Sequence, residues 1–183
     1  MSKKIKLLAL VFFALSAESF SQSSYKVINL CNNKISLSVP AGWKIKENAM
    51  RFAVYEIKYN VEVKDSKNHS GLALYVYGAQ YGPKMQITDS VVKAYKQGVL
   101  SDPVRKIKIE DSGIKVVSRI SVGYFKYTFR VSVNKKINRS FGIDMFFCDE
   151  RNIYYRIEIT GLNKSVEEFK TVAEKIFESL SIQ

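Results

Sequence analysis

Few residues in this sequence could carry out catalysis or bind a metal ion. The single histidine, His69, stands in the turn SKNHSG, and no serine or cysteine with a carboxylate is spaced to complete a triad with it. One histidine and two distant cysteines do not make a standard zinc site. A calcium loop of the D-x-D-x-D-G type and a G-x-x-x-x-G-K phosphate loop are both missing from the sequence. We therefore expect no metal site and no cofactor.

Paired carboxylates could still serve as a general acid and base. The candidates are Asp144, Glu158, Glu56 and Glu62, and each alternates with cationic residues in a segment that has strand periodicity. This alternation indicates charge ladders across a sheet rather than two carboxyl groups with separated pKa values. The sequence accordingly predicts that the protein is not an enzyme.

The strand segments 114–122, 124–133, 139–147 and 152–160 place their polar residues at alternate positions. If these strands are neighbours, their polar sides form one face rich in arginine, lysine and tyrosine. That face is either a solvated surface with cross-strand ion pairs or a recognition surface for an acidic protein. The candidate partner-binding residues are Arg119, Tyr124, Lys126, Arg130, Tyr154 and Arg156.

A second candidate lies in GLALYVYGAQYGPKM, a tyrosine-rich strand followed by a predicted loop over 78–84. The rings of Tyr75, Tyr77 and Tyr81, together with Lys84, could line a groove for a peptide, a glycan or another small ligand. Packing within the sheet explains Tyr75 and Tyr77 equally well.

The N-terminus has the pattern of a secretory signal. Three lysines precede an apolar stretch over 7–17 that is too short to span a bilayer. Small residues at Ser19 and Ser21 favour cleavage after residue 21, with cleavage after Ser19 as the alternative. No cysteine directly follows that stretch, so a lipid anchor is not expected. The prediction is a signal peptide over 1–21 and a single α+β domain over 22–183, either periplasmic or secreted.

Charge and cysteine content fit an exported protein. Residues 1–21 carry three lysines and one glutamate, a net +2 of the chain's +12, so the mature part keeps about +10. Export makes nucleic acid an improbable target, and anionic lipids, cell-wall polymers or an acidic protein are the alternatives to plain solubility. An oxidising compartment permits a disulfide between Cys31 and Cys148, and two buried thiols are the alternative.

The order of elements predicts an α+β fold. A hairpin turns at Asn32 and Asn33, strands follow over 51–65 and 72–77, and a helix capped by Thr88 or Asp89 covers about 89–100. Five more strand segments fill 104–160 with short connections that favour antiparallel neighbours. Apolar residues at helical spacing from Val166 to Leu180 then predict a terminal amphipathic helix. The expected architecture is an antiparallel sheet with an inserted helix and a C-terminal helix packed on it.

Two stretches resemble the PsbP-like and DcrB-like exported proteins: KISLSVPAGWKIKEN, with its Pro-x-Gly-Trp turn, and the closing strand and helix that end in FKTVAEKIFESLSI. The resemblance covers roughly 25–183. It implies an antiparallel sheet sandwiched by helices and non-enzymatic work on other proteins, and it supplies no binding residues. Within the turn, Trp43 is predicted to anchor the sheet core rather than to contact a ligand.

The leading functional hypothesis is an exported, non-enzymatic binding or accessory module that acts on a protein partner at the bacterial envelope. An inhibitor or immunity protein is one subclass. The alternatives are a small-ligand carrier with a pocket between sheet and helix, and an enzyme without an evident active site.

Overall fold

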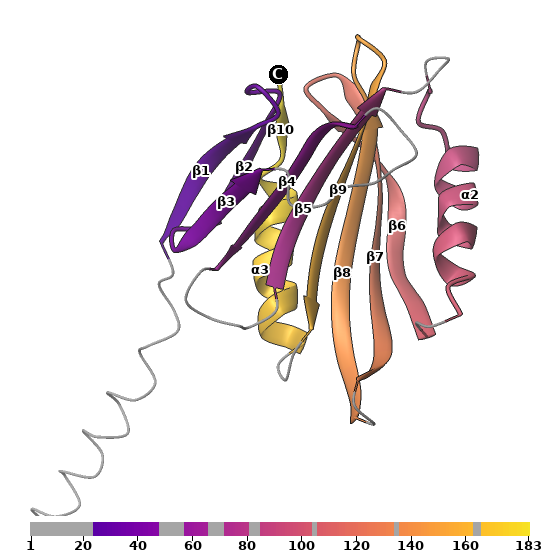
Figure 1. Cartoon of the computed structure of the whole chain (residues 1–183). Coiled ribbons are helices and arrows are strands. Elements are labelled where there is room, and N and C mark those ends of the chain that lie inside the picture. The colour runs from indigo at the N-terminus through magenta and orange to yellow at the C-terminus, as the bar shows by residue number, and fades with distance from the viewer. Residues whose placement is uncertain are drawn as a thin grey trace, which may run out of the picture.

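The computed structural model describes residues 24–47, 57–65, 72–80, 85–103, 106–133, 136–162 and 166–183 (Figure 1). The predicted signal peptide over 1–21 lies outside these ranges, as do His69, Glu56, Tyr81 and Lys84. The rest of the chain can be compared with the expectations from the sequence.

The strands form two antiparallel sheets. The smaller sheet has three strands in the order β1-β2-β10, and the larger has seven in the order β3-β4-β5-β9-β8-β7-β6. Strands of the smaller sheet are β1 (Tyr25–Leu30), β2 (Ile35–Pro40) and β10 (Ser181–Ile182). Those of the larger sheet are β3 (Trp43–Glu47), β4 (Ile57–Asp65), β5 (Leu72–Gln80), β6 (Lys106–Val117), β7 (Ile120–Val133), β8 (Lys136–Cys148) and β9 (Ile153–Leu162).

Two helices pack on this framework. Helix α2 (Asp89–Leu100) packs against β6 and β7, and helix α3 (Val166–Glu178) packs against β8, β9 and β2. In Figure 1, α3 lies behind the large sheet and α2 stands beside β6 at the right. The predicted α+β class is confirmed, with mostly antiparallel sheets and two helices packed on them. Neither helix of the described part is long and apolar enough to cross a membrane.

Local sequence signals explain both helices. The Thr88 side chain accepts a hydrogen bond from the Val91 backbone N–H at 3.4 Å, so Thr88, and not the alternative Asp89, is the N-cap of α2. The apolar stripe of α3 buries Ala173, Ile176 and Phe177. Because these residues repeat at helical spacing, they form one face that packs on the sheet.

Some boundaries differ from the predictions. The loop expected over 78–84 begins later, because Gly78, Ala79 and Gln80 continue β5 and pair with β9. Strand β3, which was not predicted, starts at Trp43 and pairs with β4. Trp43 is 5% exposed and belongs to the main core, which agrees with its predicted anchoring role.

Each face of the large sheet carries a buried core. The main core joins the α3-side face to α3 and the smaller sheet, and a second core lies between the other face and α2. The second core contains Val92 of α2 together with Phe125, Phe129 and Phe146 of the sheet. Some polar side chains of the strands therefore lie beneath a helix, as Lys126 does beneath α3 and Arg156 beneath α2.

No disulfide joins Cys31 and Cys148, since both carry thiols. Cys31 lies in the β1–β2 turn, where Cys31, Asn32 and Asn33 all have positive φ angles of 55°, 55° and 63°. The Cys148 thiol donates to Asn152 Oδ1 at 3.4 Å. The Cys148 sulfur thus has an acceptor within its own turn, and the predicted cross-link is not formed.

Candidate functional site

The predicted single polar face does not exist, although β7, β8 and β9 are neighbours as expected. Lys126 of β7 stands opposite Ile143 of β8, and Ile143 stands opposite Ile159 of β9. Directly opposite residues share a face of the sheet. The polar side of β7 therefore shares a face with the apolar side of β9, and Arg156 lies on the other face.

The β7 candidates are occupied on the α3 side. The Tyr124 ring packs against Phe177 of α3 at 5.2 Å between centroids, and Lys126 pairs with Glu174 of α3 at 3.4 Å. Arg130 is exposed farther along β7, and Arg119 lies exposed in the β6–β7 turn with φ 70°. The structure thus separates the candidates that we expected together.

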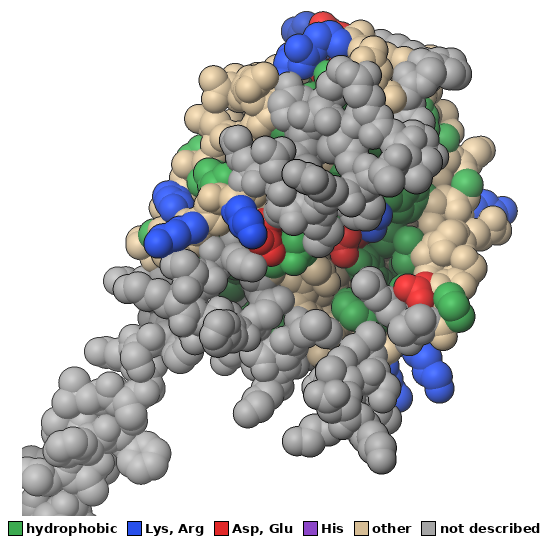
Figure 2. All heavy atoms as spheres, in the orientation of Figure 1, with side chains coloured by type: hydrophobic (Ala, Val, Ile, Leu, Met, Phe, Trp, Pro, Cys, Tyr) green, Lys and Arg blue, Asp and Glu red, His purple; other side chains and the backbone are tan. Residues whose placement is uncertain are grey.

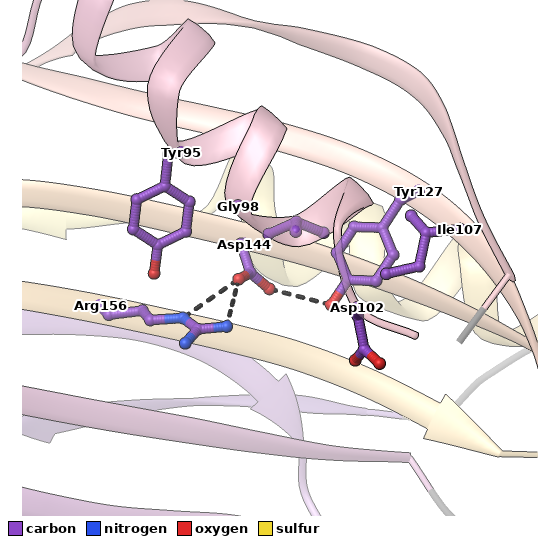
Figure 3. Close-up of a pocket in the computed structure, with 8 residues that line it drawn as sticks. Tyr95, Gly98, Asp102, Ile107, Tyr127, Asp144 and Arg156 are labelled. Atoms are coloured by element: carbon purple, nitrogen blue, oxygen red, sulfur yellow. Dashed lines mark hydrogen bonds and ion pairs between the residues drawn. The ribbon is translucent and has the colours of Figure 1, made fainter. Parts of the chain in front are cut away.

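Tyr154 and Arg156 face α2, where the structure forms a pocket of about 310 Å³. Tyr154 packs against the second core, and Arg156 lines the pocket. Figure 3 shows the pocket between α2 and the sheet. Its lining residues come from α2, the turn after it and four strands: Tyr95, Gly98, Val99, Asp102, Ile107, Tyr127, Asp144 and Arg156.

A buried ion pair forms the floor of this pocket. Arg156 Nη2 lies 2.6 Å from Asp144 Oδ2, and Arg156 Nε donates to the same oxygen at 3.1 Å. Asp144 Oδ1 accepts a hydrogen bond from the Tyr127 hydroxyl at 3.1 Å (Figure 3). The Asp144 side chain is 1% exposed, whereas that of Arg156 is 33% exposed. Both carboxylate oxygens of Asp144 are therefore engaged, and the guanidinium is the charged group that reaches the opening.

Arg156 has two further neighbours. Its Nη2 lies 3.3 Å from Glu158 Oε2, and its guanidinium lies 5.6 Å from the Tyr95 ring centroid. Tyr95 in turn stacks on Phe146 at 4.6 Å. The guanidinium is thus held by two carboxylates and faces an aromatic ring, so its orientation is fixed before any ligand arrives.

Gly142 makes room for this arrangement. It stands directly opposite Tyr127, and a Cβ atom at Gly142 would lie 2.5 Å from the Tyr127 ring. The absence of a side chain lets the tyrosine lie flat across β8 and reach Asp144. This is one position where the structure requires glycine for close packing.

Burial dominates the electrostatics of the site. Burial raises the pKa of the Asp144 carboxyl to about 6, although the Arg156 cation opposes that shift. Burial alone would lower the pKa of Arg156, but the neighbouring Asp144 carboxylate raises it well above its ordinary value. At neutral pH the pair is ionised.

Tyr75 and Tyr77 continue the polar surface next to the pocket. Tyr77 stands opposite Arg156 and Tyr75 opposite Glu158, and the two rings stack with centroids 6.4 Å apart. Burial and the Glu158 charge raise the pKa of Tyr77 to about 12. The structure thus brings two residues of the predicted ligand loop beside Arg156, while Tyr81 and Lys84 lie outside the described residues.

Figure 2 shows this side of the molecule, where acidic, basic and hydrophobic side chains meet in a hollow near the centre. A second hollow of about 550 Å³ lies at another part of the surface and includes Arg119, Lys34 and Cys148. Its lining mixes both charges with apolar groups. Within the described ranges, no group of three or more metal-ligating side chains is present.

The burial of Asp144 was not predicted from the sequence. Its predicted place was a solvated charge ladder, but the structure buries it completely beneath α2. A signal was available, because Asp144 is the only charged residue in the otherwise apolar run FGIDMFF. A lone acid in a buried strand needs a partner, and Arg156 supplies it.

Comparisons with known proteins support the fold alone. No protein-family model matches the chain, and no curated protein sequence matches it. The solution structure of CyanoP, the cyanobacterial PsbP of Synechocystis sp. PCC 6803, matches with a TM-score of 0.57 and 12% identity, over 90% of this chain and 96% of that one. The Ran-binding protein Mog1p of Saccharomyces cerevisiae matches with a TM-score of 0.53 and 9% identity, over 88% and 96%. The chain has the Mog1/PsbP-like fold, and the predicted resemblance to PsbP is confirmed at this level.

Proposed function

We propose that this protein is a non-enzymatic binding module that acts on a protein partner at the bacterial envelope after export. The observation that carries the proposal is the pocket beneath α2, where Arg156 is oriented by Asp144 and faces Tyr95. Arginine and tyrosine are enriched among the residues that dominate protein interfaces. A pocket of about 310 Å³ suits one anchoring side chain of a partner.

The state of the carboxylates argues against catalysis. Asp144 and Glu158 stand opposite each other on β8 and β9, as a general acid and base could. However, both oxygens of Asp144 already accept hydrogen bonds, and its side chain is 1% exposed. A catalytic carboxyl must reach the proton it transfers, so the pair is better suited to holding Arg156. Among the fold's other members, Mog1p is a binding protein.

Filling the pocket tests the proposal without touching its charges. Gly98 lines the pocket from α2, and open space surrounds the position where its Cβ would lie. Gly98→Leu places a side chain there and favours the helix. Lys93→Leu is the matched control, since Lys93 is exposed on the same helix and does not line the pocket.

Tagged residues 22–183 would be used to recover partners from the native envelope. We expect Gly98→Leu to lose the partner that the wild-type protein and Lys93→Leu both retain. Equal recovery by all three proteins would remove the pocket from the proposal.

A small-ligand carrier is the second candidate, because the pocket volume falls at the lower end of the range typical of ligand sites. Native mass spectrometry of the wild-type protein and Gly98→Leu distinguishes the two. A small molecule retained by the wild-type protein and absent from the variant would favour the carrier.

A further inference from the structure

A row of cationic side chains crosses three strands at one end of the large sheet. Lys106, at the start of β6, stands opposite Arg130 of β7, and Arg130 stands opposite Arg139 of β8. Lys108 lies two residues farther along β6 on the same side. All four side chains are exposed. We call these four residues the cationic row, and it lies on the α3-side face.

The row is unfavourable for the isolated protein. Neighbouring strands lie about 4.8 Å apart, and like charges that stand directly opposite each other destabilise a sheet. Two nearby acids on this side already have partners: Glu110 pairs with Lys170 at 2.8 Å, and Glu174 pairs with Lys126. Across the described ranges, no ion pair joins any member of the row to a carboxylate.

The row adjoins the pocket around one edge of the sheet. Strand β6 is the edge strand of the seven. Its residue Ile107 lines the pocket on the α2 side, and Lys106 and Lys108 flank Ile107 and belong to the opposite face. In Figure 1, β6 begins and β7 ends at the same, lower end of the sheet. A partner seated in the pocket therefore reaches the row by passing the β6 edge.

We propose that the cationic row binds an acidic segment of the protein partner, through carboxylates that bridge neighbouring strands. This inference rests on the proposed function and names the chemistry of the partner. The guanidinium groups of Arg130 and Arg139 can each bind a carboxylate with two parallel hydrogen bonds. The net charge of about +10 on residues 22–183 steers acidic partners toward the protein over longer distances.

A membrane surface fits the row less well. Proteins that lie on a membrane insert apolar side chains beside their cationic residues. The large hydrophobic residues that the described part exposes are Val27, Ile45, Leu100 and Val116. None of them lies among the residues of the cationic row. Val116 is at the far end of β6, opposite Ser121.

The first test measures binding of an acetylated peptide of alternating glutamate and threonine by fluorescence anisotropy at low salt. We expect the double variant Arg130→Glu/Arg139→Glu to bind at least about tenfold more weakly than the wild-type protein. Lys44→Glu/Lys93→Glu is the matched control, because it changes the net charge equally at exposed residues outside the row. We expect less than about a twofold effect there. If both double variants bind the peptide equally weakly, net charge alone explains the loss of binding and the proposal is overturned.

The second test measures whether the cationic row lowers the thermal stability of the isolated protein. We expect Arg130→Gln and Arg139→Gln each to raise the melting temperature by about 1–4 °C at low salt, and the gain to vanish at high salt. A row that served structure alone would give lower melting temperatures instead. That result would refute the reasoning.

Two further comparisons show whether the cationic row or the proposed function has failed. If Gly98→Leu loses the envelope partner while Arg130→Glu/Arg139→Glu keeps it, the row is not part of the interface and the proposed function stands. If both variants keep the partner, both proposals fall. Binding to phosphatidylglycerol vesicles that requires the row, without binding to the acidic peptide, would show that the target is a membrane.

Discussion

Removal of the Arg156 side-chain charge should destabilise the protein strongly, and the loss should depend on pH. Arg156→Met leaves the Asp144 carboxylate buried at 1% exposure without its cation at 2.6 Å. Breaking a buried pair in this way typically costs about 3–5 kcal/mol, because the remaining charge is uncompensated. We expect a loss of this size in the free energy of unfolding at pH 8.

The pH dependence follows from the pKa of Asp144. Burial already raises that pKa to about 6, and Arg156 is the main influence that holds it down. In Arg156→Met the pKa rises further, so the folded variant takes up a proton that the unfolded chain does not bind. Between pH 8 and pH 6 the variant regains up to about 1.4 kcal/mol per pH unit, while Asp144 of the wild-type protein, with its pKa of about 6, takes up a proton only toward the lower end of this range.

Urea unfolding followed by the fluorescence of Trp43 measures both effects. Trp43 is the only tryptophan and is 5% exposed, so unfolding changes its surroundings. Asp144→Asn/Arg156→Met is the control for the carboxyl, and its stability should not show the extra recovery between pH 8 and pH 6. Lys93→Met removes an exposed charge and should change stability by less than about 0.5 kcal/mol. A loss below about 1 kcal/mol in Arg156→Met at pH 8, or the same loss at both pH values, would refute this account of the pair.

Three other variants probe the packing around the two helices. Gly142→Ala should lower the free energy of unfolding by about 1–3 kcal/mol, because the new Cβ would displace the Tyr127 ring. Gly98→Ala, where the Cβ meets open space, should raise it by about 0.5–1 kcal/mol in the same urea assay, and a loss in both would contradict the steric explanation. Lys115 donates to the Phe177 carbonyl at 2.7 Å, and burial lowers its pKa to about 8. Because the folded state gives up this proton before the unfolded state does, the wild-type protein should gain stability from about pH 8 to pH 10 relative to Lys115→Met, and parallel pH profiles would exclude that role.

Much of the fold could be predicted because its signals are local. Thr88 caps a helix whose bounds were expected within a residue, and the stripe around Ile176 identifies the face of α3 that is buried. Asn32 and Asn33 mark the first hairpin, since asparagine tolerates a positive φ. These features depend on residues a few positions apart, so a single sequence contains them. The short strand β10 could not be predicted in this way, because its pairing with β2 joins opposite ends of the chain.

By itself, the sequence determined which residues of each strand share a side, because side chains alternate with a period of two. Only the tertiary structure decided which sides of neighbouring strands coincide. The register between β7 and β8 places Lys126 with Ile143, and it places Phe125 with Asp144. On each face of the large sheet, the polar side of β7 or β8 therefore lies beside the apolar side of the other strand. The result is that Lys126 meets α3, and Arg156 meets Asp144 beneath α2. Strand periodicity contains no information about that choice, since it depends on contacts between residues far apart in the chain.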